Sequence, residues 1–557
     1  MTGRQTESPV NRTPRRPCTD PLRAGIRPRV RRKASKSHSL LWCYTFYTIW
    51  LLVSCGPGGK MGAFLDLLDG VLDAAMMLLA LAILMALIAV VVLYVIDVTQ
   101  NSQAIRKNYP VIGRLRYLFE HLGVFFRQYF FAMDREELPF NRTQRAWVAR
   151  AAKKLDSTIA FGSTKPLNRP GDIFFLNSAF PPTKDEIKAH VSMPTIFGEG
   201  CVREPYAAPS LFNISAMSYG ALSGPAIEAL SMGAATSGVW LNTGEGGLSP
   251  FHQTAACDLV FQIGTAKYGV RDDDGNLDIE KITGLAAIPQ VRMFEIKLSQ
   301  GAKPGKGGIL PAEKVTDLIA TTRGIPPGED SISPNRHPEV TDADSLLDLI
   351  DRVRTASGKP TGIKLVLGQT AWLDDFCEAI HARGLASAPD FITLDSADGG
   401  TGAAPQGLMD NMGLPVASSL PLVDEKLTSA GLRERIKLIA SGKMINPSGV
   451  AAALCLGADV VCSARGFMFS LGCIQALQCN ENTCPTGITT HDPKLQKGLD
   501  PTVKADRVAN YAISMQEEVE LIAHSCGELD PQALSRQHAF VINDQGQPSP
   551  LATHLSP

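Results

Sequence analysis

The stretch Phe391–Gly402, FITLDSADGGTG, joins a short β-rich run to a loop of mostly small residues. The run Phe391–Asp395 combines aromatic, β-branched and aliphatic residues, which is typical of a buried strand. The glycines that follow allow the backbone to approach a ligand closely. Because the same unit recurs along the chain, its repetition predicts the fold.

Eight such runs alternate with helical patterns after about residue 210. Two of the helices have clear start signals: Ser223 before Gly224–Thr236, and Asp342–Asp344 before Ser345–Thr355. Strands that alternate with helices pair in parallel, and eight units predict a closed (β/α)8 barrel of the α/β class. An open doubly wound sheet is the alternative. The eight runs are Leu211–Met217, Gly238–Asn242, Leu259–Ile263, Arg292–Leu298, Gly362–Leu367, Phe391–Asp395, Ile436–Ala440 and Asp459–Cys462.

The loops that follow these runs are rich in glycine and read SYGALS, TGEGG, SQGAKPGKGG, SADGGTG, SGK and SARG. In a barrel they line the carboxyl-terminal face, where barrel enzymes place their sites. Ser441–Lys443 and Ser463–Arg465 follow the seventh and eighth strands. Barrels commonly hold a phosphate group at this position, so the loops predict an anion site.

Three closely spaced cysteines, Cys473, Cys479 and Cys484, lie in the run GCIQALQCNENTCPTG. Thiolates this close in sequence can surround one soft metal centre, and Pro485 after the last cysteine is also seen in iron–sulfur runs. A zinc site completed by His491 is the alternative. The twelve cysteines of the 557-residue chain otherwise stand singly in apolar runs and do not form a disulfide pattern.

The segment Ala74–Ile96 has 23 residues without a charge, long enough to span a bilayer core of about 30 Å. Positive residues follow the segment and acidic ones precede it, so we expect the large carboxyl-terminal part on the cytoplasmic side of an inner or cytoplasmic membrane. The charged residues are Asp66, Asp69 and Asp73 before it, and Arg106, Lys107, Arg114, Arg116 and Arg127 after it. The net charge of −1 gives no indication of nucleic-acid binding.

Residues 1–60 are interpreted in two ways. They read as a basic, disordered extension, in which the apolar run Ser39–Cys55 is a marginal second span. Alternatively, Gly58-Gly59-Lys60 is the translation of a ribosome-binding site, and Met61 is the true start. We expect residues 100–205 to connect and pack on the barrel, 206–500 to form the barrel with its cysteine loop at 473–484, and 501–557 to form a carboxyl-terminal helix, Val503–His524, and a tail.

Four charged residues have candidate roles in the predicted barrel mouth. Lys303 lies between glycines in a strand-end loop, and Arg323 carries a guanidinium that can grip a carboxylate in a bidentate manner. A solvated surface position is the alternative for each, and likewise for Glu245 in TGEGG. Lys364 alternates with apolar residues on a strand, where an unpaired charge is costly unless an anion is bound nearby.

Taken together, the motifs MSYGALS, NTGEGG, QGAKPGKGG, DGGTGAAP and CNENTCPTG resemble the FMN-binding synthase domain of glutamate synthase, over roughly residues 130–530. The resemblance implies FMN in the barrel and a three-iron, four-sulfur cluster (3Fe-4S) on the three cysteines. It also implies that 2-oxoglutarate and ammonia form 2-iminoglutarate, which is reduced to L-glutamate. In this scheme the cluster receives electrons from an external carrier and passes them to FMN.

The resemblance also assigns individual residues. Gln300, Lys303 and Arg323 match the positions that contact the oxo-acid, and Glu245 lies in the loop associated with ammonia and FMN, so Lys303 and Glu245 are the candidate catalytic residues. The positions that match the flavin site are Met217, Ser218, Gly220, Lys364, Gly400, Ser441, Gly442, Lys443, Ala464 and Arg465.

The chain also departs from the family pattern. We find no room for the glutaminase domain with which complete members begin and no G-x-G-x-x-G fingerprint. Free or partner-supplied ammonia and an external electron donor, either ferredoxin-like or a membrane carrier, are therefore expected. Ile309 and His491 stand where the family has glutamine. Two other hypotheses are a related enzyme that uses another amine or oxo-acid, such as an alkylamine, and a non-catalytic membrane electron-transfer subunit.

Overall fold

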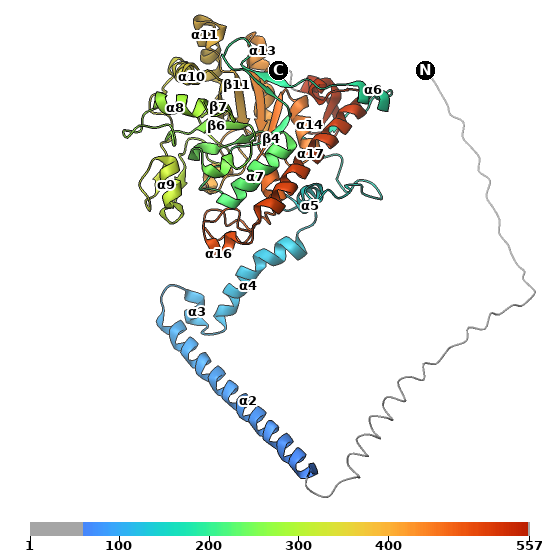
Figure 1. Ribbon diagram of the computed structural model, residues 1–557. Coiled ribbons are helices and arrows are strands. Elements are labelled where there is room, and N and C mark those ends of the chain that lie inside the picture. The colour runs from blue at the N-terminus through green and yellow to red at the C-terminus, as the bar shows by residue number, and fades with distance from the viewer. Residues whose placement is uncertain (1–59, 555–557) are drawn as a thin grey trace, which may run out of the picture. The chain divides into compact units, whose positions relative to one another are not determined.

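The computed structural model describes residues 60–554 (Figure 1). The chain divides into two compact units, Met1–Arg127 and Gln128–Pro557. A long apolar helix dominates the described part of the first unit, and the second unit contains the barrel.

Eight parallel strands form a closed barrel, so the predicted (β/α)8 fold is confirmed and the open-sheet alternative is wrong. The barrel closes where the last strand pairs with the first, with Val461 opposite Phe212. Figure 1 shows helices arranged around these strands. The strands are β4 Phe212–Ile214, β5 Leu241–Asn242, β6 Leu259–Ile263, β7 Val291–Lys297, β10 Thr361–Leu365, β11 Phe391–Asp395, β12 Lys437–Ser441 and β13 Val460–Ser463. β6 and β11 have the predicted bounds, and the other six strands differ from the predicted runs only at their ends.

A hairpin closes the amino-terminal end of the barrel. Its strands, β2 (Thr195–Phe197) and β3 (Tyr206–Ala208), pair antiparallel. The Phe197 ring packs edge-on against Trp240 at 5.9 Å and against Phe391 at 5.6 Å, and these two residues stand at the beginnings of β5 and β11. The apolar plug leaves the opposite, carboxyl-terminal end of the strands for the site.

The helices between strands begin and end at the local signals that the sequence contains. In α7 (Gly224–Ser237) the Ser223 side chain accepts a hydrogen bond from the Ala226 N–H, and Gly238 ends the helix with φ +70°. Asp342 caps α10 (Ala343–Ser357) in the same way. The other helices beside the barrel are α8 Ile279–Ala286, α11 Ala371–Arg383, α13 Val416–Ser429, α14 Pro447–Cys455, α15 Arg465–Leu471 and α17 Pro501–Cys526.

The regular repeat is interrupted between β7 and α10. Here the chain forms a small antiparallel hairpin, β8 (Ile309–Leu310) with β9 (Ser331–Ile332), and a short helix, α9 (Asp317–Arg323). At its start the Ala302 N–H donates to the Ala397 carbonyl at 2.9 Å, which holds this excursion beside the end of β11. Several of the predicted substrate-binding residues lie on it.

The first unit contains α2, Lys60–Thr99. Its part Gly62–Thr99, which includes the predicted span, has a mean hydropathy of 3.2 in its most apolar window, and none of that window is buried. Within residues 60–554 it is the one helix long and apolar enough to cross a membrane. That composition suits a membrane anchor and also a signal sequence. The interpretations of residues 1–59, including the Ser39–Cys55 span, concern sequence outside the described residues.

A close helix contact gives a test of the packing. In α7 a β-carbon on Gly233 would lie 2.5 Å from the Val508 side chain and 2.8 Å from the Ala505 carbonyl oxygen on α17. We expect Gly233→Ala to destabilise the protein by about 1–3 kcal/mol, because α17 must shift. The effect is measured as a change in the melting temperature of the second unit in thermal unfolding.

Gly284→Ala in α8 is the matched control, since a β-carbon there meets nothing within 4 Å. It should leave the melting temperature unchanged or raise it, because alanine favours a helix over glycine by roughly 1 kcal/mol. Equal melting temperatures for the two variants would contradict the packing.

Candidate functional site

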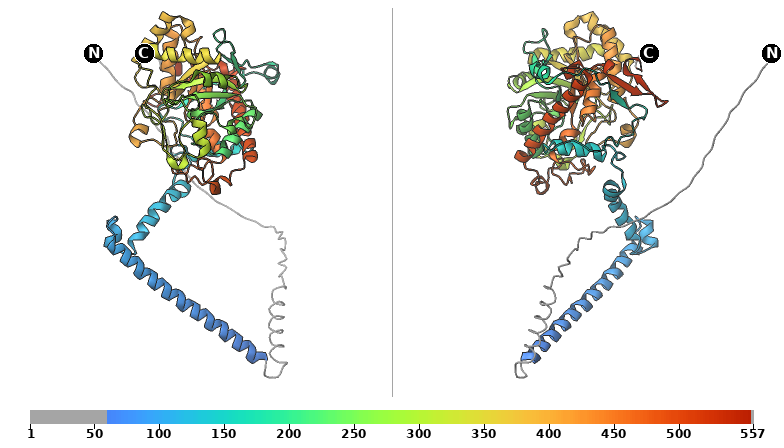
Figure 2. Two further views of the ribbon diagram at one scale, coloured as in Figure 1. Left: turned by 60° about the vertical axis from the view of Figure 1, so that its left-hand side comes forward. Right: turned by 90° about the vertical axis from the view of Figure 1, so that its right-hand side faces the viewer.

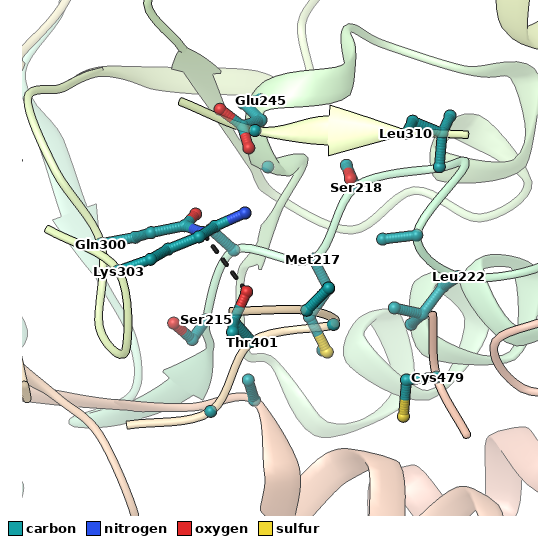
Figure 3. A pocket seen from close by; sticks show the side chains of 18 of the residues that line it. Ser215, Met217, Ser218, Leu222, Glu245, Gln300, Lys303, Leu310, Thr401 and Cys479 are labelled. Carbon is teal, nitrogen blue, oxygen red and sulfur yellow. Dashed lines mark hydrogen bonds between the residues drawn. The ribbon is translucent and has the colours of Figure 1, made fainter. Parts of the chain in front are cut away.

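A cavity of about 450 Å³ opens at the carboxyl-terminal ends of the barrel strands. Figure 3 shows Glu245, Gln300 and Lys303 on one side of it and Cys479 on another. Most of the predicted site residues line this cavity, namely Met217, Ser218, Glu245, Gln300, Lys303, Arg323, Lys364, Gly400, Ser441, Gly442, Lys443, Ala464, Arg465 and Cys479. Gly220, Cys473 and Cys484 lie outside its lining.

The lining has far more positive than negative side chains. Seven are basic, namely Lys297, Lys303, Lys314, Arg323, Lys364, Lys443 and Arg465, and two are acidic, Glu245 and Asp395. Five of the basic residues, from Lys297 to Lys364, are less than a tenth exposed. Buried charge without a counterion is costly, so this balance favours anionic ligands.

Glu245 is paired with a lysine that the sequence did not single out. It lies in a single 3-10 turn, Gly244–Gly246, and its Oε2 is 2.9 Å from Nζ of Lys297, the last residue of β7. Burial by itself would raise the pKa of Glu245, but Lys297, with smaller contributions from Lys303 and Arg323, outweighs burial and lowers it. The carboxylate is therefore charged at neutral pH.

The same lysine positions the predicted substrate residues. Lys297 Nζ also donates to Oε1 of Gln300, and Gln300 Nε2 donates to Thr401 Oγ1 at 3.3 Å, drawn as a dashed line in Figure 3. Lys303 extends into the cavity beside Gln300 and is 8% exposed. Burial lowers the pKa of Lys303, and Glu245 opposes this shift.

Arg323, at the end of α9, is held on three sides. Its Nη1 donates to Ser331 Oγ at 2.9 Å, and its guanidinium carbon lies 5.0 Å from the centre of the Tyr268 ring. Nη2 donates to the Tyr219 carbonyl at 3.4 Å, while the buried Nε has no hydrogen-bond partner among residues 60–554. Arg323 also lines the cavity, where a guanidinium is suited to a carboxylate.

The opposite part of the cavity is built from the ends of β10 to β13. Lys364 Nζ lies 3.4 Å from Asp395 Oδ2. Burial alone would lower the pKa of Lys364, but Asp395 and the buried Glu295 raise it. Lys443 Nζ lies 2.8 Å from Asp398 Oδ2. Both lysines therefore have counterions already and can still present positive charge to a ligand.

Two glycines keep the backbone of this region close-packed. Gly442 has φ +126°, and a β-carbon on it would lie 2.2 Å from the Ser396 side chain. A β-carbon on Gly400 would lie 2.4 Å from Nε of Arg465, whose Nη2 donates to the Thr401 carbonyl at 2.7 Å. Gly442 therefore requires glycine, and a side chain on Gly400 would displace the guanidinium of Arg465.

The three cysteines of the loop line a second cavity of about 590 Å³. Cys479 lines both cavities, and Arg465 Nη1 lies 3.9 Å from its Sγ. Burial raises the pKa of Cys473. Burial opposes but does not prevent a fall in the pKa of Cys484 to about 7, because the Thr486 hydroxyl and the backbone N–H groups of Thr486 and Thr489 stabilise the thiolate.

No group of three or more His, Cys, Asp or Glu side chains within residues 60–554 is arranged to hold a metal ion. The zinc alternative needed His491, but His491 Nε2 contacts the Gly220 carbonyl at 2.9 Å and its ring packs against Tyr219. Nothing in this arrangement supports a Cys3His zinc site.

Sequence reasoning missed Lys297, Tyr268 and Lys314. Lys314 is 2% exposed, and its Nζ donates to the carbonyls of Cys479 at 2.8 Å and Thr489 at 3.0 Å. It thus ties the excursion between β7 and α10 to the cysteine loop. The available signal for Lys297 was a second charge, after Glu295, at the end of a buried strand; Tyr268 and Lys314 had none.

The sequence model for the conserved region in glutamate synthase matches residues 179–528. The chain belongs to the glutamate synthase family. The matched region includes all eight barrel strands and the cysteine loop. The resemblance that the motifs indicated is therefore confirmed.

Two curated relatives illustrate the family. The chain is 38% identical over 490 residues to the glutamate synthase large subunit-like protein YerD of Bacillus subtilis (strain 168), covering 82% of this chain and 93% of that one. It is 36% identical over 315 residues to the archaeal-type glutamate synthase [NADPH] of Thermotoga sp. (strain RQ2), where the match spans 56% of this chain and only 58% of the relative. Among solved structures, a flavocytochrome b2 mutant aligns at 13% identity with a TM-score of 0.41, covering 74% of this chain and 81% of that one.

The residues of the family site fit a flavin mononucleotide. The loops after β12 and β13 offer close-packed glycine backbone and two basic side chains, Lys443 and Arg465, where a phosphate group is commonly held in barrels. The three thiols of the second cavity are soft ligands of the type that an iron–sulfur cluster takes, and Cys479 lies beside Arg465.

The Glu245–Lys297 pair provides a pH test. Replacing Lys297 by Met removes the largest charge that offsets burial, so the pKa of Glu245 should rise. In the wild type the ionised carboxylate stabilises the fold above its unfolded-state pKa, and this contribution is lost as the pH falls through the lower folded-state value. Infrared difference spectra should show the protonated carboxyl band appearing at a higher pH in the variant.

Lys306→Met is the control, because Lys306 is exposed in the loop that follows Lys297 and its charge has no part in the pKa shift of Glu245. It should leave the carboxyl band at the wild-type pH. Identical titrations of wild type and Lys297→Met would show that the pair does not set the charge of Glu245.

Proposed function

We propose that this protein catalyses the reductive amination of 2-oxoglutarate to L-glutamate, with FMN in the first cavity and a 3Fe-4S cluster on Cys473, Cys479 and Cys484. The observation that carries the proposal is the excess of buried positive charge in the barrel mouth of a glutamate synthase family member. That excess suits a flavin phosphate together with a dicarboxylate. The fold alone would not distinguish among flavin-dependent reactions.

Arg323 and Lys303 are assigned to the two carboxylates of the oxo-acid. Arg323 and Lys303 both line the cavity and are less than a tenth exposed, and the charge of Lys303 is only partly balanced by Glu245. Each charged hydrogen bond contributes about 1.5–3 kcal/mol. Holding both ends of the substrate fixes the central carbon, and orientation of this kind supplies much of the catalysis.

Glu245 is assigned to the amine. Its carboxylate is charged, lies in the same cavity, and is held by Lys297. It can accept a hydrogen bond from ammonia and take up a proton when ammonia adds to the oxo carbon and water leaves. Gly308 lies against Glu245, and a β-carbon added there would lie 3.0 Å from Oε1, so a larger residue at position 308 would crowd the carboxylate.

When bound, FMN supplies the hydride that reduces the imine carbon, and the cluster supplies single electrons to the flavin. Each turnover uses two electrons and two protons for one imine. Cys479 and Arg465 line both cavities, so the route between the two groups is short. Lys364 is assigned to the flavin ring and Lys443 with Arg465 to its phosphate.

The anchor and the electron source are also part of the proposal. We assign α2 as a membrane span, with the barrel on the cytoplasmic side, because basic residues follow the apolar segment. Free or partner-supplied ammonia and an external donor, a ferredoxin-like protein or a membrane carrier, complete the reaction.

A second candidate function uses an alkylamine in place of ammonia. Ile309 lines the first cavity and is 51% exposed, so an apolar surface faces the ligand where the family pattern has glutamine. An alkyl group on the amine would bury that surface. The third hypothesis, a non-catalytic electron-transfer subunit, does not explain the excess positive charge around Arg323 and Lys303.

The main test is turnover. Protein loaded with flavin and cluster and given a reduced dye should convert 2-oxoglutarate and ammonium to glutamate, which is measured by chromatography. Arg323→Gln should lower kcat/KM by roughly tenfold to hundredfold, through loss of a charged hydrogen bond. Arg352→Gln, on the exposed side of α10, is the control and should be neutral.

Loaded protein that makes no glutamate would refute the proposal. Product from methylamine at a higher kcat/KM than from ammonium would favour the second candidate. Oxidation of the reduced donor without any amino-acid product would favour the electron-transfer subunit.

The cluster has its own test. Cys484→Ala should lose the iron and acid-labile sulfide of the purified protein while keeping the flavin, because the two groups occupy different cavities. Cys377→Ala, a buried cysteine in α11, should keep both. Metal analysis and flavin absorbance measure the outcome, and zinc or full iron in Cys484→Ala would contradict the assignment.

A further inference from the structure

The helix that follows the apolar segment has one strongly apolar face. In α4 (Gly113–Phe126) apolar residues recur at three- and four-residue spacing, which places them on one side of the helix. They are Leu115 (50% exposed), Leu118 (50%), Phe119 (63%) and Phe125 (49%). The opposite side carries Arg116, Tyr117 and Glu120, with one exposed aliphatic residue, Val124. The first unit therefore leaves the apolar side of an amphipathic helix open.

A buried ionic cluster fixes where this helix begins. Asp97 follows the apolar run directly and is fully buried. Its carboxylate accepts hydrogen bonds from Arg106 Nε and from Arg114 Nε and Nη2, each at 2.8 Å, and from the Val111 N–H at 2.9 Å. Arg114 is in the first turn of α4, so that turn is held against the end of α2.

If α2 spans a membrane as proposed, the contact between Asp97 and Arg114 sets the depth at which α4 begins. The uncharged run ends at Ile96, so Asp97 marks the boundary of the hydrocarbon layer. The first turn of α4 then lies at the same level, in the headgroup region. Figures 1 and 2 show α4 leaving the end of α2 in a new direction instead of continuing it.

We propose that α4 lies in the membrane surface, with its apolar face in contact with the acyl boundary of a bilayer that contains anionic lipid. The inference rests on the proposed anchoring through α2 and adds a second lipid contact beside it. Between residues 98 and 127 the chain has five basic residues and one acidic residue, Glu120. That charge is complementary to anionic headgroups, and amphipathic helices with this pattern bind such surfaces. The basic residues are Arg106, Lys107, Arg114, Arg116 and Arg127.

The test uses the full chain, loaded with its cofactors, in vesicles of phosphatidylcholine and phosphatidylglycerol. A photoreactive benzoylphenylalanine is placed at Phe119 on the apolar face, or at Tyr117 on the opposite face as the matched aromatic control. After illumination, mass spectrometry counts lipid adducts. We expect at least about fivefold more lipid adduct at position 119 than at 117, because only the first contacts acyl chains.

Asp97→Asn should reduce the difference between the two positions, because it weakens the tie to Arg106 and Arg114. Equal lipid adducts at both positions, or a protein adduct at 119, would overturn the inference; the latter would show that a protein covers this face.

Alkaline carbonate extraction tests the proposed α2 membrane span separately from the proposed lipid contact of α4. Protein that is extracted from the vesicles refutes the α2 span and with it the inference. Protein that stays in the membrane but gives no lipid adduct at position 119 refutes the α4 inference alone. The synthase activity is measured separately and does not enter either readout.

Discussion

The constraint on which the site depends is the burial of several positive charges at one end of the barrel. Lys297, Lys303, Arg323 and Lys364 are each less than a tenth exposed, and two acidic side chains share the cavity with them. Glu245 and Asp395 compensate Lys297 and Lys364, so the remaining positive charge is the part that a bound anion would stabilise. A phosphate-bearing cofactor and a dicarboxylate substrate would together supply such anions.

The carboxylates inside the barrel decide how these charges are positioned. Glu245 holds Lys297, and Asp395 holds Lys364. Beneath them the Glu295 carboxylate accepts three hydrogen bonds, from Asn242 at 2.8 Å and from Gln262 and Thr393 at 2.6 Å each. Such a satisfied network is rigid, so the lysine ends are held in place before a ligand arrives. Preorganised charge of this kind is what a flavin site needs.

Local patterns were enough to predict the barrel, because each strand is a short apolar run and each loop is marked by glycine. The strands β6 and β11 were predicted with their bounds, and α7 begins at its predicted cap. The motifs also indicated most of the residues that line the cavity. The partners of those residues were not predictable, since Lys297, Tyr268 and Lys314 come from separate elements and meet the site only through tertiary packing. The apolar face of α4 has the helical period in the sequence, but its exposure follows from the fold.

The excess positive charge in the barrel mouth is proposed to bind a dicarboxylate. Calorimetric titration of the flavin-loaded protein with 2-oxoglutarate and with 2-oxopentanoate, which lacks the second carboxylate, tests it most directly. We expect 2-oxoglutarate to bind roughly tenfold to hundredfold more tightly, the equivalent of one charged hydrogen bond. Equal affinities for the two oxo-acids would contradict it.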